Sequence, residues 1–228
     1  MGIIRFFTAF FLLIAILPGC QTSEAVEQPK IFGNLYVRYL QDGQQIKAEA
    51  SFFEGDSAHT AQPISILGGV AFQGSGMESR NIQGKMIRYQ YENQAAYPDQ
   101  FSFQVQDESG QSHHFAAKMP PVNDFLTPDT ISKTRETTLE LQPAPGSKLE
   151  ALALLFSDAE GKASLIEIPA PLSKKIPLTP ALLSKLRPGT YQLYLVKKQR
   201  TFIEQGVYRV YFDLEFYTEV KRVVISDL

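Results

Sequence analysis

The side chains best suited to metal binding are few and scattered along the chain. The three histidines are His59, His113 and His114, and the chain holds a single cysteine. Neighbouring residues on a strand point to opposite faces, so His113 and His114 cannot both bind one metal ion without a bulge. No His-x-x-x-His motif occurs. We therefore expect surface or edge histidines, no metal site and no cofactor.

Two acidic clusters are candidates for calcium binding or acid–base catalysis. Asp107-Glu108 and the pair Asp158 and Glu160 have the side chains for calcium binding or for acid–base cleavage of a glycosidic bond. Each cluster is followed by a glycine and lies between strand-like segments, so turn formation already accounts for it. The sequence does not decide whether these turns bind calcium weakly.

One short block suggests a nucleophile. Gly55-Asp56-Ser57 resembles the serine block of GDS-type esterases, a family with an α/β fold and an Asp-x-x-His motif near its carboxyl end. Here the last histidine is His114, and the one Asp-x-x-His runs from Asp56 to His59 and overlaps the serine. We therefore expect no catalytic residues and a non-enzymatic protein. An exported hydrolase, either esterase or glycosidase, is the competing hypothesis.

Tyrosines give the best indication of a binding surface. Tyr211 and Tyr217 share the polar face of one predicted strand, and Tyr89 and Tyr91 share a face of another. Exposed tyrosines can form a platform for a glycan or a protein partner. The alternative is that they are ordinary single aromatic residues on a sheet surface.

The first 20 residues have the form of an export signal. Arg5 is followed by the apolar run Phe6 to Leu17, interrupted only by Thr8, and then by Pro18-Gly19-Cys20. Twelve helical residues span about 18 Å, well short of the ~30 Å hydrocarbon core, which favours a signal over a membrane-spanning helix.

Leu17-Pro18-Gly19-Cys20 resembles the lipobox of bacterial lipoproteins. The resemblance implies cleavage before Cys20, with Leu17 and Gly19 recognised by the signal peptidase, and attachment of a lipid to the Cys20 thiol. It also implies location in the cell envelope, and Gln21 after the cysteine favours the outer membrane where two membranes are present. The alternative is an ordinary secretory signal beside a coincidental cysteine.

The rest of the composition fits an all-β envelope protein. The net charge of −2 gives no electrostatic reason to bind nucleic acid. We expect the lipid anchor to hold the chain at the membrane and its partners to be envelope proteins or glycans. A chaperone-like or adhesive module that uses an open sheet edge is a further alternative.

Alternating apolar residues predict many short strands. Leu35, Val37 and Tyr39 precede an Asp42-Gly43 turn, and Ile46 to Phe52 return as the second strand of a hairpin. A strand is predicted at 206–217, where the alternation of Tyr208, Val210, Phe212, Leu214 and Phe216 gives the strongest strand signal. Further strands are predicted at 64–72, 85–91, 101–105, 113–118, 137–141, 149–157, 163–168, 189–197 and 221–225.

One short helix and one turn motif interrupt this pattern. Thr179 can cap a helix that begins at Pro180. The segment 186–193, LRPGTYQL, resembles a strand entry found in bacterial immunoglobulin-like and fibronectin-like modules, in which the tyrosine packs back over the sheet edge.

These patterns predict a signal peptide (1–19), a lipidated cysteine with a flexible tether (20–30), and two immunoglobulin-like antiparallel β-sandwich domains (31–121 and 122–228). The boundary is placed at Pro120 to Pro128, because adjacent prolines cannot continue a strand ladder.

Overall fold

The computed structural model describes residues 29–228. The predicted signal residues Leu17 and Gly19 and the predicted lipid site Cys20 lie outside the described residues. As predicted, the described chain is all-β: strands dominate, and α1 (Pro180–Leu183) is a single helical turn. No helix within 29–228 has the length and apolar character needed to cross a bilayer.

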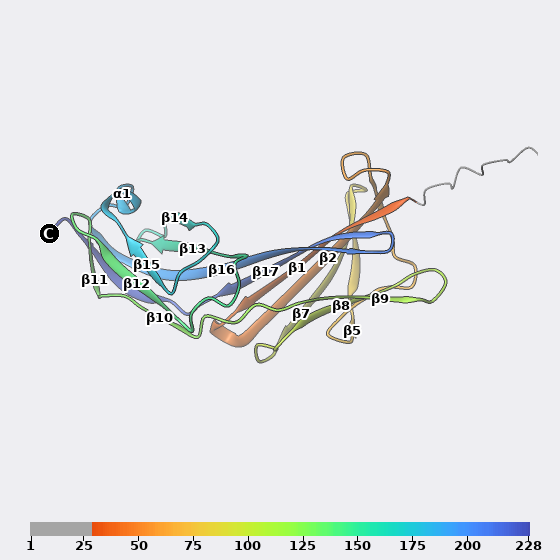
Figure 1. Ribbon diagram of the computed structural model, residues 1–228, viewed down its shortest axis with the longest axis horizontal. Helices are drawn as coiled ribbons and strands as arrows, with labels where there is room; N and C mark the ends of the chain where they lie inside the picture. The colour runs from red at the N-terminus through yellow and green to blue at the C-terminus, as the bar shows by residue number, and fades with distance from the viewer. Residues whose placement is uncertain (1–28) are drawn as a thin grey trace, which may run out of the picture.

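The strands form two lobes along the long axis of the molecule (Figure 1). We call the part built around β1–β9 the first lobe and the part built around β10–β15 the second lobe. The first-lobe strands are β1 (Lys30–Leu40), β2 (Gln45–Gly55), β3 (Gln62–Ile64), β4 (Val70–Phe72), β5 (Ser75–Gly76), β6 (Glu78–Ile82), β7 (Met86–Gln94), β8 (Phe101–Gln106) and β9 (Ser112–Ala117). The second-lobe strands are β10 (Asp124–Leu126), β11 (Thr130–Ser132), β12 (Thr137–Gln142), β13 (Glu150–Ser157), β14 (Ala163–Ile168) and β15 (Lys175–Leu178).

Three C-terminal strands complete both lobes: β16 (Gly189–Gln205), β17 (Tyr208–Tyr217) and β18 (Lys221–Ser226). The first half of β16 pairs with β13 and β18, and its second half pairs with β17. β17 in turn lies parallel to β1. One sheet, which we call the long sheet, therefore runs through both lobes in the order β11-β18-β16-β17-β1-β2-β7-β6.

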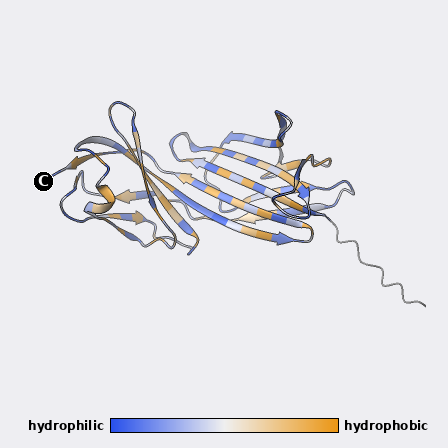
Figure 2. Cartoon of the chain, turned by 90° about the horizontal axis from the view of Figure 1, so that it is seen from above, coloured by the Kyte–Doolittle hydropathy of each residue, from blue (hydrophilic) through white to orange (hydrophobic). Residues whose placement is uncertain are grey.

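A smaller sheet covers one face of the long sheet in the first lobe. Its strand order is β5-β4-β8-β9, and its aromatic rings meet those of β17: the centroids of Phe103 and Phe212 lie 5.3 Å apart and those of Phe115 and Tyr208 lie 5.5 Å apart. In the second lobe, β10, β12 and β15 form a third sheet. Apolar and polar residues alternate along the central strands (Figure 2), so β1, β2 and β17 of the long sheet each have one buried and one outer face.

Strand pairing does not follow the predicted division at residues 121 and 122. β17 belongs to the range expected to form a second domain, yet it pairs with β1 over its whole length. The predicted boundary segment 120–128 also contains β10, which pairs with β12. The two ranges thus share one sheet, because strand pairing depends on residues far apart in the sequence. The immunoglobulin-like topology stays a prediction.

Local predictions agree more closely with the structure. Leu35, Val37 and Tyr39 are buried, and β1 and β2 pair as the expected hairpin. Thr179 caps α1 by accepting a hydrogen bond from Leu182 N (3.3 Å). Tyr191 packs back as expected, since its hydroxyl donates to Arg187 O (3.1 Å).

Candidate functional site

The outer face of the long sheet carries a cluster of aromatic and charged side chains in the first lobe and where it joins the second. These residues come from the central strands β1, β16 and β17, on the face away from the smaller sheet. We call them the outer patch: Tyr36, Arg38, Tyr194, Lys198, Arg200, Phe202, Tyr211, Asp213, Glu215 and Tyr217. The strand register brings them together, since Arg38 lies opposite Glu215 and Tyr36 lies opposite Asp213 across the β1–β17 pair.

A hydrogen-bond network fixes the centre of the outer patch. Tyr36 and Tyr217 both donate their hydroxyl protons to Glu215 Oε2, at 2.6 and 2.8 Å. Arg38 Nε donates to the Tyr36 hydroxyl (3.0 Å). The Arg38 guanidinium also lies 5.7 Å from the Tyr36 ring centroid and 5.2 Å from the Tyr217 ring centroid. Two rings are thereby held in place around one carboxylate.

Burial and the neighbouring carboxylate keep both phenols neutral. Burial, reinforced by the hydrogen bond to Glu215, raises the pKa of Tyr217 to about 12. The same two causes, burial first, raise the pKa of Tyr36 well above its usual value. Both hydroxyls therefore remain hydrogen-bond donors across the physiological pH range.

A second group lies nearer the β16–β17 turn. Arg200 makes a two-pronged ion pair with Asp213, at 2.6 and 3.0 Å, and this hydrogen bonding raises the pKa of Arg200. The Arg200 guanidinium lies 5.4 Å from the Tyr211 ring centroid, and Phe202 packs 5.2 Å from the same ring. Phe202 is 51% exposed and Tyr211 is 46% exposed, so this group presents apolar area to solvent.

The two tyrosines predicted on β17 thus lie where expected. Tyr211 is exposed and Tyr217 is half-buried, both on the polar face of the strand. Tyr36, Arg38 and Glu215 were not predicted as site residues, because their meeting depends on the pairing of β1 with β17. Alternation alone could have placed Tyr36 and Arg38 on an outer face, since they alternate with Leu35, Val37 and Tyr39.

The predicted platform at Tyr89 and Tyr91 is not an exposed surface. Tyr89 is 3% exposed, and its hydroxyl accepts a hydrogen bond from Ile66 N (2.8 Å). Tyr91 is half-buried, with its ring 5.2 Å from Phe72. The opposite face of β7 carries Arg88, Gln90 and Glu92, so the tyrosines form the more apolar face: Tyr89 packs inward, and Tyr91 is partly buried and also lines a surface hollow. Tyrosine is amphipathic and fits either face, which is why the pattern misled.

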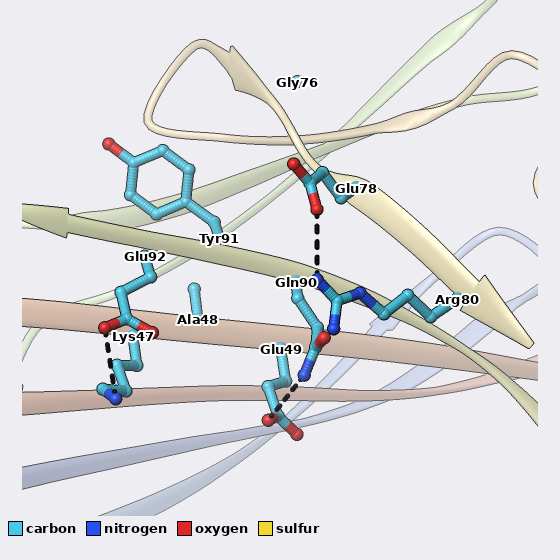
Figure 3. Close-up of a pocket in the computed structure, with 9 residues that line it drawn as sticks. All are labelled: Lys47, Ala48, Glu49, Gly76, Glu78, Arg80, Gln90, Tyr91 and Glu92. Atoms are coloured by element: carbon cyan, nitrogen blue, oxygen red, sulfur yellow. Dashed lines mark hydrogen bonds and ion pairs between the residues drawn. The ribbon is translucent and has the colours of Figure 1, made fainter. Parts of the chain in front are cut away.

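A shallow hollow lies on the first lobe where β2, β7 and β6 meet (Figure 3). Its charged groups are paired with one another: Lys47 lies 3.2 Å from Glu92, and Arg80 lies 3.5 Å from Glu78. Gln90 donates to Glu49 at 3.4 Å. We favour the outer patch as the binding surface, because it exposes the aromatic rings of Phe202 and Tyr211, whereas the lining of the hollow is mainly charged and polar.

The residues considered for catalysis are part of turns and loops. Ser57 lies in the loop between β2 and β3, where its hydroxyl is hydrogen-bonded to the Thr60 hydroxyl (2.9 Å). This loop is not the strand-to-helix turn of the esterase resemblance. Asp107 and Asp158 each accept backbone N–H groups of their own turns, as turn formation predicts.

The histidines lie as the alternation predicts. His114 is exposed, whereas His113 on the opposite face is half-buried, with Nε2 at 3.2 Å from Asp107 Oδ2. Within the described part of the chain, no group of three or more His, Cys, Asp or Glu side chains is arranged to hold a metal ion.

Comparison of this chain with protein-family models and with curated proteins found no match. The chemistry of the outer patch therefore has to be deduced from its own residues.

Proposed function

We propose that this chain is a lipid-anchored protein of the bacterial cell envelope with a non-enzymatic binding or assembly role. In this proposal, the outer patch contacts a neighbouring envelope protein. The lipobox-like segment Leu17 to Cys20 supports the anchor. Where the cell has two membranes, we place the anchor in the outer membrane. We also propose that both lobes have immunoglobulin-like topology.

The observation that carries the binding role is the network around Glu215. Two tyrosine rings and one arginine are held rigidly at the surface, so little side-chain freedom is lost when a partner binds. Tyrosine, phenylalanine and arginine are the residues that protein interfaces favour. Acidic and basic groups alternate across the outer patch, which suits a protein partner of mixed charge better than a uniformly charged polymer. A glycan is the other partner class.

The position of β1, the first described strand, agrees with a short tether (residues 20–30) between the lipid anchor and the first lobe. Ile31 N donates to Val207 O (2.9 Å), so β1 begins beside the β16–β17 turn, at the end of the first lobe far from the C-terminus (Figure 1). Nine residues lie between Cys20 and Lys30, and the ten residue-to-residue steps of a fully extended chain span about 35 Å. An anchor at Cys20 would hold this end of the first lobe close to the membrane.

The anchor is tested by Cys20→Ser in the full chain. We expect loss of acyl labelling and release of the protein from the membrane fraction, because the thiol is the predicted lipid acceptor. Labelling that persists in the variant would contradict the anchor.

The binding role is tested with a photo-crosslinking aromatic amino acid at position 217 in cells. The matched control is the same amino acid at position 126, since Leu126 is exposed on β10, a strand of the third sheet, which carries no residue of the outer patch. We expect one discrete protein adduct from position 217 that position 126 does not give. Equal adducts from both positions, or hydrolase activity of the purified full chain that Ser57→Ala abolishes, would contradict the proposal.

A further inference from the structure

One edge of β16 is only partly covered. On this side β13 pairs with Gln192 to Gln199 and begins there, at Glu150. The opposite edge of β16 is paired with β17 as far as Gln205. No strand of the described chain pairs with residues 200–205 on this side, so this stretch of β16 has an open edge. At about 3.3 Å per residue, the open edge is about 20 Å long.

This open edge has little of the protection that exposed edges normally carry. The segment RTFIEQ contains no proline and no lysine, and its pairing with β17 proceeds residue by residue without a bulge. Prolines, bulges and charged side chains, lysine above all, are the usual devices that stop an edge from pairing with another chain. Of these, the segment has only the two charges of Arg200 and Glu204, which are of opposite sign. The exposed ring of Phe202 adds apolar area beside the edge.

The side chains along the edge are complementary to themselves. Arg200, Phe202 and Glu204 share the outer face of β16. Arg200 lies two residues before Phe202, and Glu204 lies two residues after it. In an antiparallel pairing centred on Phe202, Arg200 faces Glu204 of a second copy, and Glu204 faces Arg200 of that copy. The two Phe202 rings face each other across the axis. Opposite charges and aromatic pairs at directly opposed positions stabilise antiparallel strands.

We propose that two copies of this chain associate through residues 200–205 of β16 in an isologous antiparallel dimer. The long sheet then continues across a two-fold axis at Phe202. The Arg200 and Glu204 side chains are 68% and 57% exposed, so both are accessible to a second copy. Asp213 and Arg209, their ion-pair partners within the chain, hold them on the outer face. An extended peptide of another protein would pair with the backbone but would not need this symmetry of charge. The inference does not depend on the lipid anchor.

The test is a charge swap in the full-length protein purified in detergent, with the protein mass measured by sedimentation. We expect a concentration-dependent dimer. Arg200→Glu alone, or Glu204→Arg alone, places like charges opposite each other at two positions and should weaken the dimer about tenfold. The double variant R200E/E204R restores both opposite-charge pairs and should restore the dimer.

Mixing the two single variants gives the sharpest result. One R200E chain and one E204R chain bring opposite charges together at both positions, so the mixture should form heterodimers more tightly than either variant forms homodimers. This comparison does not depend on small changes in the stability of each chain. Arg80→Glu on β6 is the matched control, since Arg80 is also exposed and ion-paired, and it should leave the dimer unchanged.

Three outcomes would overturn the proposal. The first is a protein that stays monomeric at about 100 μM. The second is a dimer that the single charge reversals do not weaken, or that Arg80→Glu weakens equally. The third is a mixture of the two single variants that dimerises no better than its components.

Discussion

Lys197 Nζ lies 2.9 Å from Glu150 Oε2, and both side chains are buried, at 2% and 0% exposure. Lys197 also donates to Pro120 O (2.8 Å), and Gly146 N donates to Glu150 Oε2 (3.1 Å). The ion pair thus joins β13, β16 and the segment that links the two lobes. Burial lowers the pKa of Lys197, and the adjacent carboxylate opposes that shift.

Lys197→Met should destabilise the protein by about 3–5 kcal/mol, because it leaves the Glu150 carboxylate buried without a compensating charge. The double variant E150L/K197M removes both charges and should recover most of this loss. Urea denaturation of both variants measures the difference. A double variant as unstable as the single one would contradict the prediction.

Asp107 should contribute stability that is lost in acid. The hydrogen bond from the Ser109 hydroxyl, followed by His113 and the backbone N–H groups of the turn, lowers the pKa of Asp107 to about 2. An aspartate in the unfolded chain has a pKa of about 3.9. The unfolded chain therefore binds more protons between these values, so the contribution is complete above about pH 4 and disappears as the pH falls to about 2.

Asp107→Asn cannot titrate, so its unfolding free energy should fall less than that of the wild type between about pH 5 and pH 2. Denaturation curves at several pH values measure this. Asp99→Asn, at an exposed loop position, is the matched control. An equal change of slope in both variants would show that the Asp107 turn is not the cause.

Gly68 allows two backbone segments to approach closely. A Cβ atom at this position would lie 2.5 Å from Gln106 O and 2.8 Å from Gln106 C, both backbone atoms. Gly68→Ala should therefore destabilise the protein by about 1–3 kcal/mol. At Gly76 a Cβ would meet no atom within 4 Å, so Gly76→Ala should change stability by no more than about 0.5 kcal/mol. Thermal unfolding separates the two, and equal effects would contradict the prediction.

Alternation of apolar residues was enough to find most strands. Tyr208, Val210, Phe212, Leu214 and Phe216 are all buried, as predicted for the strongest strand. Strand periodicity is a local property that a single sequence displays directly. The same periodicity correctly placed Tyr211 and Tyr217 on the polar face.

Properties that depend on distant residues were not predictable in this way. The run 64–72 was expected to be one strand, but the turn at Gly68 and Gly69 divides it, and β3 and β4 belong to different sheets. The extension of β16 to Gln205 and its passage through both lobes also escaped prediction. The centre of the outer patch needs the register of β1 against β17, which local patterns do not contain.

The parallel pairing of β1 with β17 also constrains the order of events during biosynthesis. Tyr36 and Glu215 are 179 positions apart in the sequence, so β1 leaves the ribosome long before its neighbour exists. The first lobe cannot complete its central sheet until β17 has been translated, and such distant contacts slow folding. Until then, the edge of β1 that pairs with β17 is open, and unpaired strand edges make a partly folded chain prone to aggregate.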